Sequence, residues 1–265
     1  MPESSDDTQL LVANLREAGI IARKYFGGTY KSWRKADGNP VTEVDILIDR
    51  FLMAALRNAR PFYGWLSEES ADDQVRLERS RIFVVDPIDG THGFLKTRPQ
   101  FTIVGAVVEN GRPVAAAIYN PIAEEMFEAP AGLGARLNGE PIRVSAAKEL
   151  AGSRLLAART LIESARWPTP WPPLSVETRA SIAYRMALVA KGEFDAMISL
   201  SKKADWDLAA GDLIVHEAGG RVTAQDGAKL VYNKREPEQQ GVICAGPALH
   251  DHLLAKLREL PAEYL

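Results

Sequence analysis

The chain has 265 residues, of which 46% are hydrophobic and 25% are charged, and these proportions are usual for a soluble globular protein. Its 32 lysines and arginines and 35 aspartates and glutamates give a formal net charge of −3, which argues against a general binder of nucleic acids or membrane surfaces. The lack of an apolar run of about 18 residues, the polar N-terminus and the single cysteine, Cys244, predict a cytoplasmic protein without a membrane span or an internal disulfide. We expect one domain over residues 1–265 with two lobes, approximately 1–145 and 146–265.

Two amphipathic helices are predicted at the start of the chain. Apolar residues recur at helical spacing over residues 10–25, with an N-cap expected among residues 6–8 and a Gly-Gly end at 27–28. A second helix is predicted at 42–59. The polar stretch 31–39 between them predicts an exposed, mobile loop.

The middle of the chain predicts a series of strands. Residues 82–85 form a fully apolar run, which is typical of a buried strand. The dipeptide Asn110-Gly111 between two longer apolar segments is a hairpin signal. The predicted strands lie at residues 62–66, 82–85, 101–109, 113–120, 125–129 and 135–137.

The second half of the chain predicts alternating helices and strands. It begins with the proline-rich segment 167–173, which we expect to be extended and outside any sheet. Helices are predicted at 180–190, 207–218 and 247–260, and strands at 194–199 and 242–245. The whole pattern indicates an α/β or α+β protein built from layers of helices and sheets.

Two aspartates follow the apolar strand 82–85, in the segment DPIDGT at residues 86–91. A proline and a glycine beside them suit a tight turn that leaves the sheet. Asp86 and Asp89 would then lie about 4–6 Å apart and repel each other. A divalent cation relieves such repulsion, and oxygen ligands favour Mg²⁺, Mn²⁺ or Ca²⁺ over zinc.

Three other pairs of acids are candidates to complete this site. One pair follows the predicted strand 62–66, one precedes the apolar helix 207–218, and one lies one turn apart on the second helix. Each pair also has a structural interpretation, as a solvated turn, a helix N-cap or a polar helix face. The pairs are Glu68 with Glu69, Asp205 with Asp207, and Asp45 with Asp49.

Two segments resemble the signatures of the inositol monophosphatase superfamily. The first is DPIDGT at 86–91, and the second is WDLAAG at 206–211 followed by EAGG at 217–220. The segment SEES at 67–70 resembles the family's acidic pair, and the resemblance extends from about Leu10 to Ala245. It implies a metal-dependent, lithium-sensitive phosphomonoesterase, commonly homodimeric, with a five-layer αβαβα sandwich of the inositol monophosphatase/fructose bisphosphatase type.

The resemblance also implies a set of metal ligands. Glu68, Asp86 and the backbone carbonyl of Ile88 would hold one Mg²⁺ ion, and Asp86, Asp89 and Asp207 would hold a second. Glu68 would help to hold a weaker third ion, and Mn²⁺ is expected to substitute for Mg²⁺. Two such ions offset the charge of the four carboxylates, so that a phosphate dianion can approach.

The implied reaction uses a water molecule as the nucleophile. One ion activates that water and the other stabilises the leaving alkoxide. Glu68 and Thr91 would orient the water, with Asp45 behind Thr91. The backbone N–H groups of Gly90 and Thr91 would bind phosphate oxygens.

The residues around the second signature bear on the substrate. Segment 199–204, SLSKKA, lacks the glutamate that inositol-specific relatives place about seven residues before the aspartate, and it carries Lys202 and Lys203. The segments GFL at 93–95 and SIAYR at 181–185 resemble 3'(2'),5'-bisphosphate nucleotidases. Ser181, Arg185 and both lysines are therefore predicted to contact the substrate, with a solvated loop as the open alternative for the lysines.

We therefore expect a metal-dependent phosphoric monoester hydrolase, which acts on 3'(2'),5'-bisphosphate nucleotides. Inositol 1-phosphate and fructose 1,6-bisphosphate are the alternative substrates. The alternative of another class is a non-catalytic binding protein with the same fold, against which the complete set of carboxylates counts. The expected partners are a small phosphorylated metabolite and a second copy of the chain, and no nucleic-acid polymer or membrane is expected.

Overall fold

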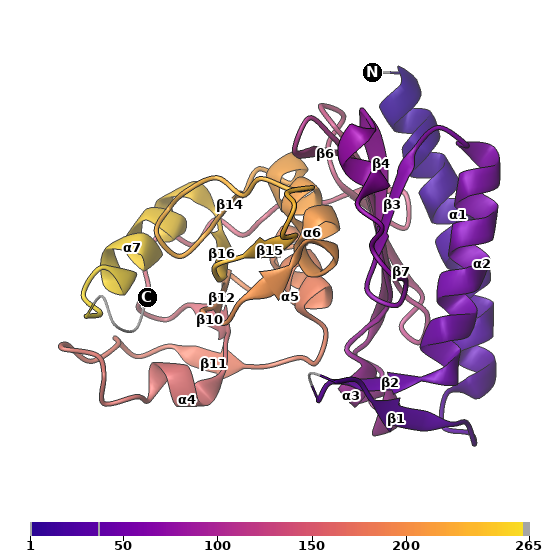
Figure 1. The fold of residues 1–265 in the computed structure, drawn as a ribbon. Helices are drawn as coiled ribbons and strands as arrows, with labels where there is room; N and C mark the ends of the chain where they lie inside the picture. The colour runs from indigo at the N-terminus through magenta and orange to yellow at the C-terminus, as the bar shows by residue number, and fades with distance from the viewer. Residues whose placement is uncertain (1, 37, 262–265) are drawn as a thin grey trace.

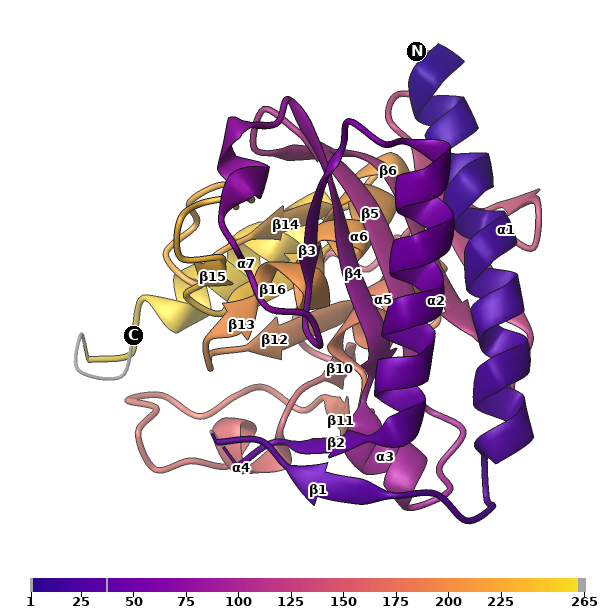
Figure 2. The ribbon, with the colours of Figure 1, turned by 45° about the vertical axis from the view of Figure 1, so that its right-hand side comes forward.

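Two sheets stand side by side, with one pair of helices between them and further helices on both outer faces (Figure 1). The computed structural model describes residues 2–36 and 38–261. From one side to the other, the layers are helix, sheet, helix, sheet, helix, as Figure 2 also shows. This order confirms the predicted αβαβα sandwich, in which each apolar face is buried against another layer.

The first sheet has seven strands in the order β3-β4-β5-β6-β7-β8-β9, and all neighbours except the parallel pair β3 and β4 are antiparallel. Helices α1 and α2 cover its outer face. The bounds are Pro2–Tyr25 for α1, Glu43–Ala59 for α2, Gly64–Ser67 for β3, Arg81–Asp89 for β4, Thr102–Glu109 for β5, Arg112–Asn120 for β6, Glu125–Pro130 for β7, Arg136–Leu137 for β8 and Glu140–Pro141 for β9.

Strand β4 is buried on both faces, as its continuous apolar run predicts. Phe83 and Val85 pack in the cluster formed with α1 and α2. Ile82 and Val84 point the opposite way, into the cluster formed with the central helices. One strand therefore joins two hydrophobic cores and holds its C-terminal end firmly in place.

Helix α1 begins earlier than the sequence predicts. It starts at Pro2, so residues 6–8 lie inside the helix and do not cap it. The carboxylate of Asp7 accepts hydrogen bonds from Arg60 Nε at 2.9 Å and from the Tyr63 hydroxyl at 2.9 Å. Thr8 donates to the carbonyl of Ser4 at 2.8 Å. Asp7 is thus used for a contact with the residues after α2, which local sequence does not reveal.

The predicted loop at 31–39 is also wrong in part. Ser32–Arg34 forms β1 and pairs antiparallel with β2, Pro40–Thr42. The pairing continues in the hydrogen bond from Lys35 N to the carbonyl of Asn39 at 2.8 Å. The polar composition of this segment gives no sequence signal for a strand. The buried side chain of Val41 in β2 holds the pair of strands in position.

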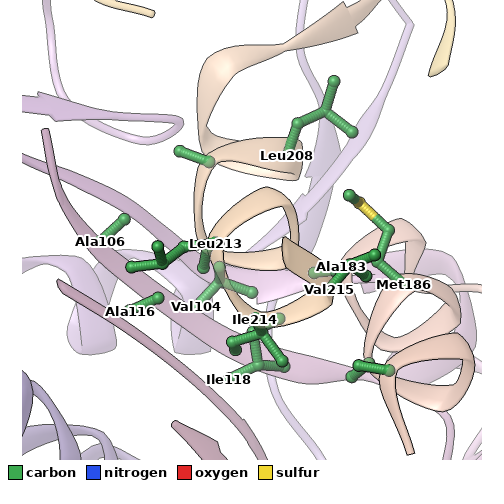
Figure 3. Packing of buried hydrophobic residues seen from close by; sticks show 14 of the residues in the cluster. Val104, Ala106, Ala116, Ile118, Ala183, Met186, Leu208, Leu213, Ile214 and Val215 are labelled. Carbon is green, nitrogen blue, oxygen red and sulfur yellow. The ribbon is translucent and has the colours of Figure 1, made fainter. Parts of the chain in front are cut away.

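Two central helices, α5 at Ile182–Ala190 and α6 at Asp205–Glu217, lie between the sheets. Ile214 of α6 packs close to Ile118 of the first sheet, and Met186 of α5 faces α6 (Figure 3). A side chain at Gly211 would approach Met186 to 2.7 Å, so that the two helices meet closely because this residue is glycine. Helix α6 therefore begins at a position fixed by both neighbours.

The second sheet has the order β11-β10-β12-β16-β14, and α7 covers its outer face. The prediction omits β10, β11 and β14, which have only three residues each and therefore show little periodicity. The remaining bounds are η1 Val75–Glu78, α3 Thr91–Leu95, β10 Arg154–Leu156, α4 Arg159–Ile162, β11 Ser175–Glu177, β12 Ala196–Ser199, β13 Lys203–Ala204, β14 Arg221–Thr223, β15 Glu238–Gln239, β16 Val242–Ala245 and α7 Pro247–Leu257. Within residues 2–36 and 38–261, none of the helices combines the length and hydrophobicity needed to cross a bilayer.

Candidate active site

Three aspartates from two signature segments meet between the first sheet and the central helices. Asp86 and Asp89 lie on the last part of β4, and Asp207 lies in the first turn of α6. One carboxylate oxygen of each residue lies within 4.8 Å of the others. The segment bearing Asp86 and Asp89 is not the predicted turn, because β4 continues through it with an irregular register against β5. This irregularity brings both aspartates to the same site.

Backbone and hydroxyl groups hold these carboxylates in place. Asp89 accepts a hydrogen bond from Ser181 Oγ at 2.6 Å and another from Ala183 N at 2.7 Å, at the start of α5. Asp86 accepts from Ile88 N at 3.0 Å, and Asp207 accepts from Ala204 N at 3.0 Å. Each carboxylate therefore keeps a defined orientation, with oxygens left to face the other two.

The electrostatics of the three aspartates show that their negative charges are unfavourable together. Burial and the neighbouring carboxylates, Glu68 first, raise the pKa of Asp86 well above its usual value. Burial also raises the pKa of Asp89 and of Asp207, and a hydrogen bond from Ser181 partly offsets the increase at Asp89. The three carboxylates supply only oxygen ligands, and the described groups around them do not neutralise their negative charges. Such a site is suited to a hard divalent cation.

Glu68 lies beside the three aspartates, since it contributes to the raised pKa of each of them. Its own carboxylate contacts Lys35 of the β1–β2 hairpin, with Nζ to Oε1 at 2.8 Å. Lys35 also contacts Glu69 at 2.6 Å. Burial raises the pKa of Glu69 to about 7, although Lys35 lowers it.

The sequence prediction missed the role of Lys35. A lysine in a polar segment is usually solvated, and 33 positions separate Lys35 from Glu68. The attraction of Glu68 and Glu69 outweighs the cost of burial and raises the pKa of the Lys35 ammonium. The hairpin is therefore attached electrostatically to the acidic cluster.

Asp45 and Thr91 form a second part of the site. Thr91 Oγ1 lies 3.1 Å from a carboxylate oxygen of Asp45 and 3.0 Å from the carbonyl oxygen of Ile88, and its single hydrogen is donated to one of these acceptors. Thr42, the N-cap of α2, bonds Asp45 through its hydroxyl and its backbone N–H. Burial is the main cause that raises the pKa of Asp45 to about 6. The Thr91 hydrogen thus points inward, which leaves the oxygen lone pairs free to accept a hydrogen bond from outside.

Asp49 holds the segment that carries Glu68. It is buried on α2 and accepts hydrogen bonds from Ser67 Oγ and Ser70 Oγ, each at 2.5 Å. These two serines flank Glu68 and Glu69 in the chain. The acidic pair is therefore fixed from both ends by one carboxylate of the neighbouring helix.

Gly90 connects β4 to α3 in a left-handed conformation with φ of 94°. A side chain there would lie 3.0 Å from the backbone nitrogen of Ser181. Glycine is needed because it tolerates this φ and allows the two segments to approach. The approach places Gly90 and Thr91 next to the Ser181–Asp89 contact.

The predicted substrate-contacting residues have different surroundings. Ser181 is buried and bonded to Asp89, as described above. The Arg185 guanidinium donates to the carbonyl of Arg179 and attracts Asp89 electrostatically. Lys202 is exposed and paired with Glu238 at 3.0 Å.

Lys203 differs from its neighbour Lys202. Its ammonium lies 2.7 Å from Ser201 Oγ and 3.1 Å from the carbonyl of Lys202, and both acceptors are uncharged. It also attracts Asp207 and lowers the pKa of that carboxyl against the larger effect of burial. Among the described residues, no carboxylate lies within ion-pair distance of Lys203.

Comparisons with known proteins agree with this geometry. The family model described as the inositol monophosphatase family matches residues 4–262. The Nus factor SuhB of Salmonella typhimurium LT2 is 30% identical over 262 residues, which cover 94% of this chain and 95% of that protein. The inositol-1-monophosphatase of Rhizobium meliloti is 30% identical over 242 residues, covering 85% and 84%.

Solved structures show the same fold. The IMPase of Thermotoga maritima superposes with a TM-score of 0.84 at 27% identity, covering 98% of this chain and 100% of that one. The suppressor protein suhB of Bartonella henselae gives 0.80 at 29% identity, covering 94% and 97%. The expected family, fold and enzyme class are therefore confirmed, and the chain belongs to the inositol monophosphatase family of phosphatases.

Proposed function

We propose that the protein is a Mg²⁺-dependent phosphomonoesterase for a small metabolite that carries a second phosphate, of the 3'(2'),5'-bisphosphate nucleotide class. The observation that carries this proposal is the Lys203 ammonium, which lies near Asp207 with only uncharged hydrogen-bond partners. A cation in such a position is available to a substrate anion that reaches past the reacting phosphate.

Asp86, Asp89 and Asp207, with Glu68 and the carbonyl of Ile88, would hold two Mg²⁺ ions, and Glu68 would contribute to a third. When bound, the ions lower the pKa of a water molecule and offset charge on the leaving oxygen. The protein groups themselves form a buried and preorganised cluster that needs little rearrangement to receive cations. Mn²⁺ fits the same oxygen ligands.

Thr91 is the group proposed to orient the attacking water. Because its hydrogen points to Asp45 or to the carbonyl of Ile88, its oxygen can accept a hydrogen bond from that water. Glu68 would accept the other water hydrogen from the opposite side. The backbone N–H groups of Gly90 and Thr91 would bind phosphate oxygens, and Ser181 would act by holding Asp89.

Inositol 1-phosphate is the second candidate substrate. The observation in its favour is the relative from Rhizobium meliloti, whose name describes an inositol-1-monophosphatase. Inositol 1-phosphate has no second phosphate, so its hydrolysis would not need the positive charge of Lys203. The two candidates therefore differ in their dependence on one side chain.

The test compares Lys203→Ala with Lys202→Ala, whose side chain is paired with Glu238. Lys203→Ala should lower kcat/KM for adenosine 3',5'-bisphosphate by about 10- to 150-fold, the usual range for a charged hydrogen bond. It should leave inositol 1-phosphate hydrolysis nearly unchanged, and Lys202→Ala should affect both substrates little. A wild-type preference for inositol 1-phosphate, or equal losses for both substrates, would contradict the bisphosphate assignment.

We further propose a homodimer in the cytoplasm, with a small phosphorylated metabolite as the partner and no nucleic-acid polymer. The single buried cysteine is compatible with a reducing compartment. Light scattering on the purified protein should give twice the mass of one chain. A monomer mass at micromolar concentration would exclude the dimer.

A further inference from the structure

The β1–β2 hairpin presents an indole ring on the same side as Lys35. Trp33 and Lys35 are two residues apart on an extended segment, so their side chains project from one face. The opposite strand contributes Val41, the direct cross-strand partner of Trp33. Val41 is only 2% exposed. Lys35, on the same face, reaches Glu68 and Glu69, so this face of the hairpin is turned toward the acidic pair.

Trp33 is nevertheless 48% exposed. Other aromatic residues near the hairpin are packed: Tyr30 and Phe26 both contact Phe94 in ring pairs. In the described part of the chain, no ring or cation contacts the Trp33 indole closely enough to form such a pair. A half-exposed indole without a ring partner has a face on which another flat group can stack.

The hairpin is also attached to the acidic pair Glu68 and Glu69. Lys35 reaches both Glu68 and Glu69, at 2.8 and 2.6 Å. In two views the hairpin extends past α3 toward β11 and α4 (Figures 1 and 2). The chain that follows β11 leads to Ser181, which bonds Asp89. Because Glu68 adjoins the three aspartates, the hairpin that carries the indole lies beside them.

We propose that Trp33 is a specificity-determining residue whose indole stacks on the heterocyclic base of a nucleotide substrate. This inference rests on the proposed bisphosphate nucleotide function and identifies the group that would recognise the base. Lys35 anchors the hairpin at Glu68, so the distance between the indole and the reacting phosphate is set by the same two strands. Phe62 is more exposed, at 80%, but it lies outside this hairpin.

The test uses Trp33→Ala and two controls. Trp33→Phe retains a ring, and Ser32→Ala changes the preceding residue, whose side chain projects from the other face of β1. Each variant is assayed with adenosine 3',5'-bisphosphate and with glycerol 2-phosphate, which has no aromatic group. Quenching of tryptophan fluorescence by adenosine 5'-monophosphate is measured as a second readout.

Trp33→Ala should reduce kcat/KM for the nucleotide by about 5- to 150-fold, mainly through KM, which corresponds to about 1–3 kcal/mol of stacking. Hydrolysis of glycerol 2-phosphate should change less than about twofold, which would show that the variant is folded. Trp33→Phe should recover most of the loss, and the quenching by the nucleotide should be absent in Trp33→Ala.

Three outcomes overturn the inference and can be told apart. If the wild type cleaves the nucleotide and Trp33→Ala does so with unchanged KM and quenching, Trp33 has no part in recognition while the proposed function stands. If the wild type does not cleave the nucleotide, the proposed function and the inference fail together. Equal losses for both substrates would indicate that the substitution disturbs Lys35 and the hairpin, and would also contradict a role in base recognition.

Discussion

At the scale of single residues, the site depends on carboxylates placed where their charge is costly. Asp86 and Asp89 are buried, and Asp207 adjoins them. Buried like charges raise the free energy of the unliganded protein, because each favours protonation of the others. The same arrangement favours a bound cation. The three carboxylates therefore make the folded protein less stable when no metal is bound, and a bound cation would stabilise it.

Replacing Asp89 by Asn should lower turnover at saturating Mg²⁺ by at least about 100-fold. The substitution removes one charge of the cluster while it preserves the shape of the side chain and an oxygen that accepts from Ser181 and Ala183. Steady-state kinetics over a Mg²⁺ titration provide the measurement. Near-normal turnover by the variant would exclude Asp89 from the reaction site.

Replacing Asp86 by Asn should stabilise the metal-free protein by about 1–3 kcal/mol at pH 8. The pKa of Asp86 is raised in the folded state, so the folded protein binds more protons than the unfolded chain, and stability falls as the pH rises. Urea denaturation in the presence of a chelator at pH 5 and pH 8 measures the difference. The exposed Asp6→Asn variant is the control, and a destabilised Asp86→Asn protein at pH 8 would contradict this account.

At the scale of elements, short contacts between neighbouring segments orient the side chains of the site. Asp49 on α2 holds the two serines that flank Glu68 and Glu69. Lys35 connects the β1–β2 hairpin to the same acidic pair. The geometry of Glu68 therefore depends on a helix and a hairpin as well as on its own strand.

The contact between α7 and β14 predicts a specific loss of stability in acid. His250 is buried and its Nε2 lies 3.0 Å from Thr223 Oγ1, and burial lowers its pKa from 6.5 to about 4. The unfolded chain then binds the proton more readily, so this contribution is complete above about pH 7 and is lost as the pH falls from 6.5 to 4. His250→Gln should reduce the loss over this window by about 2–3 kcal/mol.

Denaturation midpoints at several pH values between about 4 and 7.5 test this prediction. His252→Gln is the matched control, because His252 lies on the same helix and is exposed. The control should lose stability in acid as the wild type does. Identical pH profiles for His250→Gln and the wild type would show that His250 does not cause the effect.

At the scale of the whole molecule, a few buried polar contacts join distant parts of the chain. The guanidinium of Arg76, in the connection after β3, donates to Asn233 Oδ1 at 2.6 Å and to the carbonyl of Lys234 at 3.0 Å. It also pairs with Asp72 at 2.7 Å. Asn233 in turn donates its backbone N–H to Asp205, two residues before Asp207. Arg76 thus connects the first sheet to the loop that supports the second signature.

Replacing Arg76 by Met should destabilise the protein by about 1–3 kcal/mol, because it leaves the part-buried acceptors of Asn233, Lys234 and Asp72 without their donor. Chemical denaturation measures the effect, and Arg79→Met, at an exposed position three residues away, is the control. A loss below about 1 kcal/mol would mean that the contacts of Arg76 contribute little to stability.

Local patterns in the sequence were sufficient for the main elements and the ligand candidates. Neighbouring residues alone define the apolar run of β4, the Asn110-Gly111 hairpin and the spacing within each signature. Such patterns can be interpreted without knowledge of the tertiary structure. Local pattern predicted Asp86 and Asp89 together and left Asp207 as one of several candidates, and the resemblance of the two signatures to the family implied the group of three. The proximity of their oxygens supports that group.

Other features were decided only by the tertiary structure. The pairing of β1 with β2, the contact of Lys35 with Glu68 and the hydrogen bond of Ser181 to Asp89 join residues that have no sequence signal for each other. The three-residue strands β10, β11 and β14 are likewise too short to show a period. Such contacts arise because burial in a shared core brings distant backbone segments together, and only then do individual polar groups find their partners.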